Sequence, residues 1–452
     1  MIVSSFFRNK KILILGLGVT GLNLYKALIK SKAIVYTWDD NLLVSKNISK
    51  KIDPKNFKFN QLDYCVPSPG IPTKGKDTHP IINLVKINNI EIISELDLFQ
   101  LYLNSSNDYL SDAIKIIVVT GTNGKSTVVS LIDHVLKKLN YNTSLIGNIG
   151  KSIFQSKVIK NGFYIIEASS YQLETTSIFK PHFSLLTNIS RDHIKRHKTL
   201  EEYAMQKFKI FKNLTNNDTA IITWDNKIIK NLINKFLSKK KFDLIKISGK
   251  NKKNTYYYNN HSIYKDTTFV YKSQNPYLIG RHNLENISIV LALLDATKNL
   301  TSKSLKAINN FKGLAHRQEI VRKIKKTIFI NDSKATNIES SIRALETFKN
   351  IYWICGGVTK SKNMNLALPF LKNVKKIYII GCEKNIFIKS FSRHIETVYI
   401  KDMNKAIKDA FLSSKKQKKT STILLSPAAA SFDQYKNFET RGNSFKKYVK
   451  NI

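Results

Sequence analysis

The sequence has few cysteines and no long apolar run. Its three cysteines, Cys65, Cys355 and Cys382, lie far apart and form no C-x-x-C pair, which supports neither a disulfide framework nor a structural zinc site. The apolar runs have the length of strands and are well short of the roughly 20 residues that a membrane helix needs. We therefore expect a cytoplasmic protein of a reducing compartment with no membrane partner.

Acidic residues are scarce. Asp and Glu number 32 against 74 Lys and Arg, so the formal net charge is +42 at pH 7. Such a charge attracts nucleic acid, anionic lipid or phosphorylated ligands. The composition is also what an A/T-rich genome imposes through codon supply, and no aromatic-basic recognition module is visible. We expect no nucleic-acid partner. A nucleic-acid-binding NTPase is the alternative of another class, and it predicts steeply salt-dependent DNA or RNA binding.

The length of 452 residues exceeds one typical core and predicts several domains. Apolar strands alternate with helical segments, which favours an α/β fold with parallel sheets. We expect a Rossmann-like domain over residues 1–108, a central P-loop ATPase-type domain over 109–312 and a Rossmann-like α/β domain over 313–452. The polar stretch 101–112 suits a linker, and the Lys- and Asn-rich stretch 238–260 predicts surface hairpins.

A glycine-rich turn follows the first apolar strand. The turn GLGVTG (16–21) joins the strand 12–15 to a helix over 20–30, and Asp39 and Asp40 end the next strand. Glycines let a diphosphate approach the amides at a helix N-terminus. The pattern fits a nicotinamide or flavin enzyme, a UDP-sugar site, or a tight turn without a ligand.

A second turn has a more specific pattern. The segment TGTNGKST (120–127) lies between the apolar strand 116–119 and a helix over 126–139. Its amides and Lys125 can cradle nucleoside-triphosphate phosphates, and Ser126 can ligate Mg²⁺. Val119 stands where the standard loop has its first glycine. The segment is therefore a variant P-loop, and ATP is the expected nucleotide.

A diphosphate-type first domain followed by TGTNGKST resembles the Mur ligases, the ATP-dependent amino-acid-adding enzymes of peptidoglycan synthesis. The resemblance covers nearly the whole chain. It extends to GRHNLEN (280–286), and the chain departs from the family pattern at Ala315 and Thr359. Folylpolyglutamate synthetases share the loop but normally begin with the P-loop domain. They remain an alternative enzyme of a neighbouring class.

The resemblance implies three groups of residues. The implied ATP-binding residues are Gly121, Thr122, Asn123, Gly124, Lys125, Ser126, Thr127, Asn283, Asn286, Arg317 and Asp332. The implied UDP-substrate-binding residues are Gly18, Val19, Thr20, Asp39, Asp40, Ser68 and Asn148. The implied catalytic residues are Lys125, Asn148, His193, Lys207 and Arg317.

Several residues are metal-ligand candidates. Glu167 ends an apolar strand, and α/β sheets bind ligands at that edge. His193 and His197 have the spacing of a helical zinc pair, although no third ligand follows. The resemblance instead implies two Mg²⁺ ions held by Ser126, Glu167, His193 and Lys207, the last as a carbamate formed with CO₂. From the residues alone, Lys207 reads as an exposed lysine, whose pKa near 10.4 disfavours the neutral amine that CO₂ requires.

The segment NDSKATN (331–337) bears on the amino acid that is added. The D-glutamate-adding members of the family carry this motif. The resemblance then implies a monomer that joins D-glutamate to UDP-N-acetylmuramoyl-L-alanine through an acyl phosphate. The positive charge of Lys334 would attract a carboxylate of a dicarboxylic amino acid. The implied D-glutamate contacts are Lys334, Thr336, Lys360, Ser431 and Phe438. A ligase adding L-alanine is an alternative that substrate choice would reveal.

Overall fold

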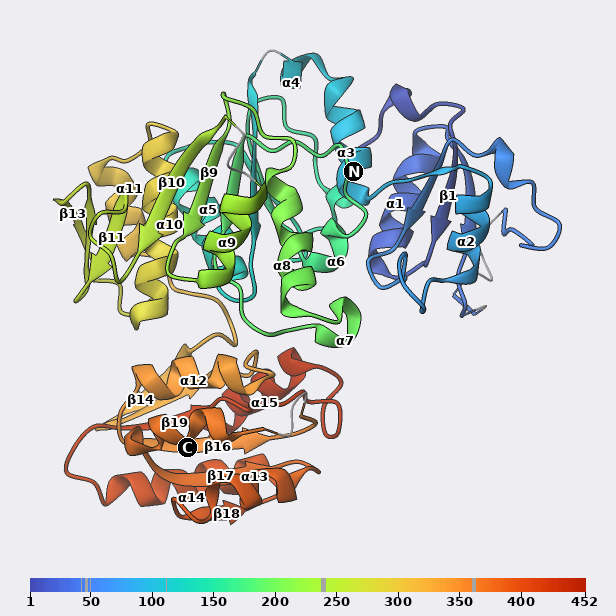
Figure 1. Cartoon of the computed structure of the whole chain (residues 1–452). Helices are drawn as coiled ribbons and strands as arrows, with labels where there is room; N and C mark the ends of the chain where they lie inside the picture. Colours follow the sequence, from blue (N-terminus) through green and yellow to red (C-terminus); the bar gives the residue numbers. More distant parts are fainter. Residues whose placement is uncertain (42, 45–47, 49, 111, 237–240, 360–362) are drawn as a thin grey trace. The chain divides into compact units, whose positions relative to one another are not determined.

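A computed structural model describes residues 1–452 except 42, 45–47, 49, 111, 237–240 and 360–362. The chain forms two compact units, one made of residues 1–273 and 285–308 and the other of 274–284 and 309–452. Helices cover three sheets of mainly parallel strands (Figure 1). The α/β class predicted from the sequence is confirmed, with one sheet for each of three domains. In the part of the chain that the structure describes, every helix is too short or too polar to cross a bilayer.

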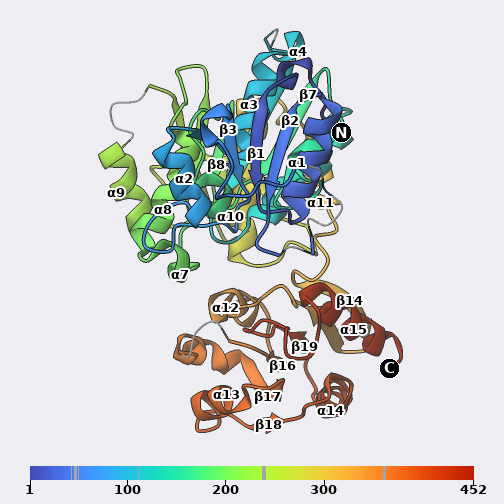
Figure 2. The same cartoon turned by 90° about the vertical axis from the view of Figure 1, so that its right-hand side faces the viewer.

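The first sheet has four parallel strands in the order β2-β1-β3-β4. In β1 the side chains alternate, so that Ile12 and Ile14 pack into the core shared with α1, while Leu13 and Leu15 pack into the core shared with α2. The two helices lie on opposite sides of β1 (Figures 1 and 2). Burial on both faces explains why residues 12–15 of this strand are all apolar. The elements are β1 (Lys11–Leu15), α1 (Val19–Lys30), β2 (Ile34–Trp38), β3 (Tyr64–Pro67), α2 (Pro80–Ile87) and β4 (Glu91–Ile92), with short 3₁₀ turns at Ser5–Phe7 and Phe59–Gln61.

The second sheet has nine strands in the order β13-β12-β11-β10-β9-β8-β5-β7-β6. Its strands are β5 (Ile114–Thr120), β6 (Thr143–Gly147), β7 (Gly162–Glu167), β8 (Phe183–Leu186), β9 (Thr219–Thr223), β10 (Asp243–Ser248), β11 (Tyr256–Asn259), β12 (Ser262–Lys265) and β13 (Thr268–Lys272). The predicted hairpins over 238–260 are wrong in part, because β10 pairs in parallel with β9 and buries Ile247. Antiparallel pairing begins only at β11.

Helices and short 3₁₀ turns connect these strands. They are α3 (Glu95–Asn104), α4 (Asn107–Leu110), α5 (Lys125–Lys138), α6 (Ser170–Leu173), α7 (Ile194–His197), α8 (Leu200–Phe208), α9 (Lys227–Phe236), α10 (Arg281–Ala296) and α11 (Ser302–Asn309), with turns at Ile153–Gln155 and Lys209–Phe211. Residues 101–104, expected in a linker, belong to α3, because Phe99, Tyr102 and Leu103 continue its buried face.

Asp97 fastens α3 to the loop before β8. Its buried carboxylate accepts hydrogen bonds from the backbone N–H groups of Ser177, Ile178 and Phe179 at 2.9–3.1 Å. The same carboxylate accepts the Ser94 amide at 3.0 Å and closes a capping box at the start of the helix. One side chain therefore both begins α3 and attaches it to the central sheet.

The third sheet has six strands in the order β14-β15-β19-β16-β17-β18, and only β14 is antiparallel to its neighbour. Trp353 and Cys355 of β16 face one core, and Tyr352 and Ile354 face the other. The elements are β14 (Glu319–Ile324), β15 (Thr327–Asn331), α12 (Ile338–Thr347), β16 (Ile351–Gly356), β17 (Val374–Ile380), α13 (Lys384–Phe391), β18 (Thr397–Tyr399), α14 (Met403–Lys415), β19 (Ser421–Leu425) and α15 (Phe438–Lys450), with a 3₁₀ segment at Asn365–Asn373.

Candidate active site

A cleft of about 820 Å³ lies in the first unit between the glycine turn after β1 and the loop after β5. It brings together predicted residues of both ligand groups, which are Gly18, Val19, Thr20, Asp39, Ser68, Lys125, Asn148, His193 and Lys207. Further lining residues that the sequence reasoning did not single out are Ser152, Ser169, Ser170, Tyr171, Gln172, Asp192 and Tyr203. One cleft thus joins the diphosphate-type turn to the phosphate loop.

The glycine turn is held by two side chains from neighbouring strands. The Leu17 amide donates to Asp39 Oδ2 at 2.6 Å, and Ser68 Oγ donates to the Gly16 carbonyl at 2.6 Å. Asp40 does not line the cleft. It accepts a hydrogen bond from Trp38 Nε1 at 3.0 Å and lies 3.1 Å from His79 Nε2, and the contact with His79 lowers its pKa. The two adjacent aspartates therefore act in different places.

The phosphate loop turns into α5 at Gly124, whose φ is +87°. A Cβ at this position would overlap Asn286 Oδ1, which places Asn286 against the loop. Lys125 Nζ donates to the carbonyls of Gly121 at 2.8 Å and Thr122 at 2.9 Å. The lysine therefore curls over the concave side of the loop, where it can meet an anionic phosphate.

Asn188, just after β8, clamps this loop and was missed by the sequence reasoning. Its carbonyl accepts the Thr122 amide at 2.8 Å, and its side chain both accepts from the Asn123 amide at 3.0 Å and donates to the Asn123 carbonyl at 3.1 Å. Like Glu167, it is a polar residue at the carboxyl end of an apolar strand. That position was the signal that could have identified it.

Glu167 ends β7 and is 1% exposed. Its Oε1 accepts a hydrogen bond from Asn148 Nδ2 at 2.8 Å, and among the described residues no hydrogen-bond partner meets Oε2. A buried carboxylate oxygen without a protein donor fits a hard cation such as Mg²⁺. The hydroxyl of Ser126 in the phosphate loop is a ligand of the same hard class.

No three His, Cys, Asp or Glu side chains converge on a metal position, as far as the described ranges extend. A magnesium site beside Glu167 therefore needs donors of other types. Ser126 and a carbamate on Lys207 are donors of that kind, so the residue types present are compatible with the ligand set that the family resemblance implies, of which His193 and Lys207 line the cleft.

Lys207 is 1% exposed, so the expectation from the residues alone that it is a surface lysine is wrong. Tyr203, Ala204, Lys207 and Phe208 make one buried face of α8, a spacing that could have revealed its position. Its Nζ donates to the Gly121 carbonyl at 2.8 Å and lies 4.7 Å from the centre of the Tyr203 ring. Burial, reinforced by the charge of Lys125, lowers the pKa of Lys207 well below its usual value. This shift increases the fraction of the neutral amine that CO₂ requires.

His193 and His197 do not form the helical zinc pair that their spacing suggests. His193 precedes α7 with a φ of +53° and so lies outside the helix, although both rings pack against Tyr171 and Tyr203. Its Nδ1 is 3.1 Å from the Tyr171 hydroxyl, and its Nε2 is 3.4 Å from Asp192 Oδ2. His197 is buried against Ser170 Oγ at 3.0 Å, and burial lowers its pKa to about 4.

In the second unit, Lys334 Nζ lies 3.6 Å from the centre of the Phe438 ring, so two predicted glutamate contacts meet. Arg441 is 1% exposed and donates to Ser333 Oγ at 3.0 Å and to the Ala429 carbonyl at 3.0 Å. It thereby ties the NDSKATN segment to the segment that follows β19. Of the other predicted contacts, Thr336 is half-buried, Ser431 is buried, and Lys360 lies outside the described residues.

Asp332 follows β15 and accepts hydrogen bonds from Ser426 Oγ at 2.8 Å and the Gln318 amide at 3.2 Å. Burial raises its pKa to about 7, and the charge of Arg317 opposes this rise. These two predicted ATP contacts are therefore electrostatic neighbours. Asn283 belongs to this unit, whereas Asn286, one turn further along α10, belongs to the first.

The fold and the cleft define an α/β enzyme that handles phosphate groups. Residues 119–294 match the model of the Mur ligase middle domain. The chain is 33% identical to the UDP-N-acetylmuramoylalanine–D-glutamate ligase of Rickettsia bellii over 97% of both chains, and 34% identical to that of Rickettsia prowazekii over 98% of both. The ligase of the same name from Bartonella henselae is 32% identical over 99% of both chains. The chain therefore belongs to the Mur ligase family and is a ligase.

Solved structures share the fold. MurF from Acinetobacter baumannii matches with a TM-score of 0.64 at 13% identity, covering 99% of this chain and 93% of that one. The UDP-N-acetylmuramate-alanine ligase MurC from Thermotoga maritima matches with a TM-score of 0.59 at 17% identity, covering 98% and 99%. These matches extend over the whole chain, which agrees with the three-domain α/β architecture.

Proposed function

We propose that this chain uses ATP to ligate D-glutamate to UDP-N-acetylmuramoyl-L-alanine, a step in the synthesis of peptidoglycan precursors. The observation that carries the proposal is the shared cleft, in which the glycine turn after β1 faces the phosphate loop and buried Lys207. The full-length relatives carry the name of this reaction. Because ATP and the UDP-linked precursor are cytoplasmic compounds, we place the reaction in the cytoplasm. We expect the enzyme to act as a monomer.

The reaction first requires an activated carboxylate, since a carboxylate resists attack by an amine. The alanine carboxylate attacks the γ-phosphorus of ATP and releases ADP, which leaves an acyl phosphate. The amine of D-glutamate then attacks the acyl carbon and phosphate departs. Lys125 and Arg317 neutralise charge on the transferring phosphoryl group. Asn148 orients the carboxylate of Glu167 and the reacting end of the UDP-substrate.

The nucleotide contacts follow the two turns. Gly18, Val19, Thr20, Asp39 and Ser68 hold the UDP-substrate, with Asp40 supporting the edge of that site. Amides of residues 121–127 hold the phosphates of ATP, while Asn283, Asn286 and Asp332 contact its nucleoside. Two Mg²⁺ ions held by Ser126, Glu167, His193 and carbamylated Lys207 would screen the developing negative charge. The domains that contribute these residues are taken to be 1–108, 109–312 and 313–452.

D-glutamate is proposed to bind in the second unit. The ammonium of Lys334 attracts a carboxylate of the amino acid, and Thr336, Ser431 and Phe438 shape the site together with Lys360. The cation–π contact between Lys334 and Phe438 gives the lysine a defined position before the amino acid binds.

The test is phosphate release from ATP with Mg²⁺ and UDP-N-acetylmuramoyl-L-alanine, comparing D-glutamate with L-glutamate, L-alanine and no amino acid. We expect release that depends on D-glutamate and a product heavier by one glutamyl residue in mass spectrometry. Turnover with L-alanine instead would contradict the assigned acceptor.

For Lys207, we expect a carbamate signal in ¹³C NMR after incubation with ¹³C-bicarbonate, and this signal should be absent from the variant Lys207→Ala. Formate should restore part of the activity of that variant.

A further inference from the structure

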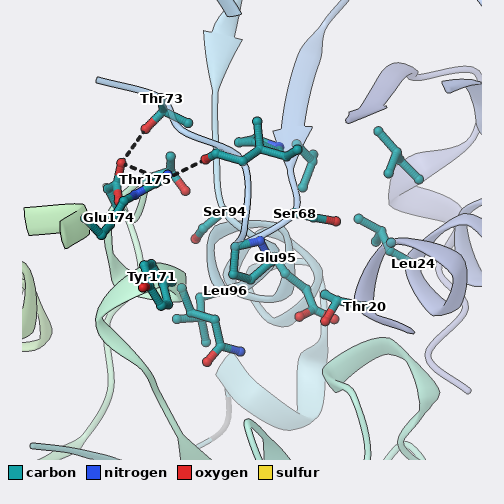
Figure 3. A pocket seen from close by; sticks show the side chains of 18 residues that line it. Thr20, Leu24, Ser68, Thr73, Ser94, Glu95, Leu96, Tyr171, Glu174 and Thr175 are labelled. Carbon is teal, nitrogen blue, oxygen red and sulfur yellow. Dashed lines mark hydrogen bonds and ion pairs between the residues drawn. The ribbon is translucent and has the colours of Figure 1, made fainter. Parts of the chain in front are cut away.

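A small pocket adjoins the cleft and joins the first sheet's loop 68–73 to residues that follow β7. Figure 3 shows Thr73 pointing toward Glu174 in the lining of this pocket, and the dashed line between them is the hydrogen bond from Thr73 Oγ1 to Glu174 Oε1 at 3.0 Å. Both side chains are buried. Their hydrogen bond crosses from the domain expected to hold the UDP-substrate to the domain expected to hold ATP.

Arg196, on α7, completes this contact. Its Nε donates to Glu174 Oε2 at 3.0 Å and its Nη2 donates to Glu174 Oε1 at 3.2 Å, a bidentate pair of two largely buried side chains. The same Nη2 donates to the Ile71 carbonyl at 2.7 Å. We call Thr73, Glu174 and Arg196 the Glu174 latch. It fixes the loop 68–73 to α7 through a backbone contact and a side-chain contact.

Tyr171 contacts both the latch and His193. The Arg196 guanidinium lies 5.6 Å from the centre of the Tyr171 ring, and the Tyr171 hydroxyl is 3.1 Å from His193 Nδ1. Tyr171 lines both the small pocket and the main cleft. A hydrogen bond at one imidazole nitrogen orients the ring and determines what the other nitrogen can do. Movement of Arg196 would therefore be transmitted to His193.

The other end of the latch meets the substrate side. Ser68 and Ile71 line the main cleft, and Ser68 holds the glycine turn through the Gly16 carbonyl. We propose that Arg196 is a positioning residue that couples the loop 68–73 to His193, so that a bound UDP-substrate and the proposed metal site favour one another. The coupling rests on the proposed function. It adds a residue that touches neither substrate nor metal and acts through Glu174 and Tyr171.

The test measures this coupling directly in the full-length protein. Mn²⁺ affinity is measured by electron paramagnetic resonance with ADP, in the presence and absence of UDP-N-acetylmuramoyl-L-alanine. We expect the UDP-substrate to tighten Mn²⁺ binding by at least about 5-fold, and Mn²⁺ to tighten substrate binding equally by linkage. Arg196→Lys keeps the charge but loses the bidentate fork, so the effect should fall to about 2-fold or less. Arg8→Lys, at an exposed arginine of the same unit, should behave as wild type.

Steady-state kinetics give a second readout. Arg196→Lys should raise the KM for the UDP-substrate and lower kcat, each by about 10-fold, while the KM for ATP changes by less than about 2-fold. A merely structural role predicts a lower Tm with unchanged coupling, and that result would overturn the proposal. Equal coupling in wild type and Arg196→Lys would also overturn it.

Two milder variants keep the test valid if Arg196→Lys does not fold. Thr73→Val removes the hydroxyl that bonds to Glu174 and should weaken binding of the UDP-substrate in calorimetry. Tyr171→Phe removes the hydroxyl that contacts His193 and should weaken Mn²⁺ binding. Both should reduce the coupling, whereas Tyr141→Phe, which loses its bond to Asn299 at 2.8 Å, should not. If these two variants show wild-type coupling, the proposal is wrong. If wild type itself binds no UDP-substrate, the proposed function has failed, which is a separate result.

Discussion

Asn148 Nδ2 donates to Glu167 Oε1 at 2.8 Å, and the Asn148 amide N–H donates to the Glu167 carbonyl at 2.9 Å. Glu167 ends β7 and Asn148 directly follows the neighbouring strand β6, whose last residue, Gly147, pairs with Glu167. This double contact fixes one carboxylate oxygen and leaves Oε2 for a ligand. Because only one of its two carboxylate oxygens is bonded within the described protein, we assign Glu167 a ligand-binding role in addition to its place in the fold.

The first prediction concerns that oxygen. Glu167→Gln keeps the shape and an acceptor for Asn148 but removes the negative charge, so turnover at saturating Mg²⁺ should fall by about 100-fold or more. The Tm should stay within about 4 °C of wild type. Phosphate release and thermal unfolding check the two statements, with Glu202→Gln on the exposed side of α8 as the control. A Gln variant of wild-type activity would remove Glu167 from the site.

The second prediction compares two glycines of one turn. A Cβ at Gly18 would have no atom within 4 Å, whereas a Cβ at Gly21 would overlap the Gly16 carbonyl oxygen. Gly18→Ala should therefore change the free energy of unfolding by less than about 1 kcal/mol, while Gly21→Ala should destabilise by about 2 kcal/mol or more. Urea unfolding measures both. Because Gly18 lines the cleft, its variant should weaken binding of the UDP-substrate in calorimetry despite its stable fold.

The third prediction concerns the stability of the fold against pH. Burial raises the pKa of Glu95 to about 8 in the folded state. The unfolded chain releases this proton near pH 4.3, so between about pH 4.3 and 8 the folded state binds more protons and stability falls as pH rises. The loss in the free energy of unfolding has an upper limit of about 5 kcal/mol and is complete above about pH 8. Glu95→Gln removes this contribution.

Urea unfolding at pH 6 and pH 9 tests the sign. The Glu95→Gln variant should gain stability relative to wild type as pH rises, while Glu91→Gln, at an exposed position of the same domain, should follow wild type. Parallel pH profiles for wild type and Glu95→Gln would contradict the prediction. The range above pH 6 is chosen because His182 and His197, whose pKa values burial lowers to about 4, contribute mainly at lower pH.

The fourth prediction concerns the clamp on the phosphate loop. Asn188→Ala removes both side-chain bonds to Asn123 and should raise the KM for ATP by about 10-fold, because the loop amides lose their fixed orientation. The KM for the UDP-substrate should stay within about 2-fold. Asn213→Ala is the control, since its side chain also bonds to loop backbone, but to the carbonyls of Ser177 and Phe179 instead of the phosphate loop. Equal ATP KM values for both variants would contradict the role of Asn188.

The parts that were predictable from the sequence were those where local chemistry fixes the backbone. The glycine turn at 16–21 and the loop at 120–127 could be identified, because each follows an apolar strand and opens a helix. Lys207 could not be placed by its residue type, since its burial depends on packing of α8 against the loop. The i, i+4 spacing of His193 and His197 misled, because the left-handed backbone at His193 lies outside the helix.

The polar stretch before β5 shows a different limit. Asn, Ser and Asp side chains indicate a linker by composition, yet α3 extends to Asn104 and its apolar face is buried. Likewise, the lysines around β10 concealed a parallel strand whose partner, β9, lies about twenty residues earlier in the chain. Pairing and docking across such distances cannot be deduced from local composition.

The attachment of α3 by Asp97 has a practical consequence for dividing the protein into fragments. A fragment ending at residue 108 keeps this carboxylate but loses the amides of Ser177, Ile178 and Phe179, which leaves a charge exposed on a helix that has also lost its packing surface. A fragment that ends before Ser94 omits α3 and therefore does not contain this carboxylate. When the first sheet is expressed alone, the shorter fragment should therefore be less prone to aggregate than the longer one.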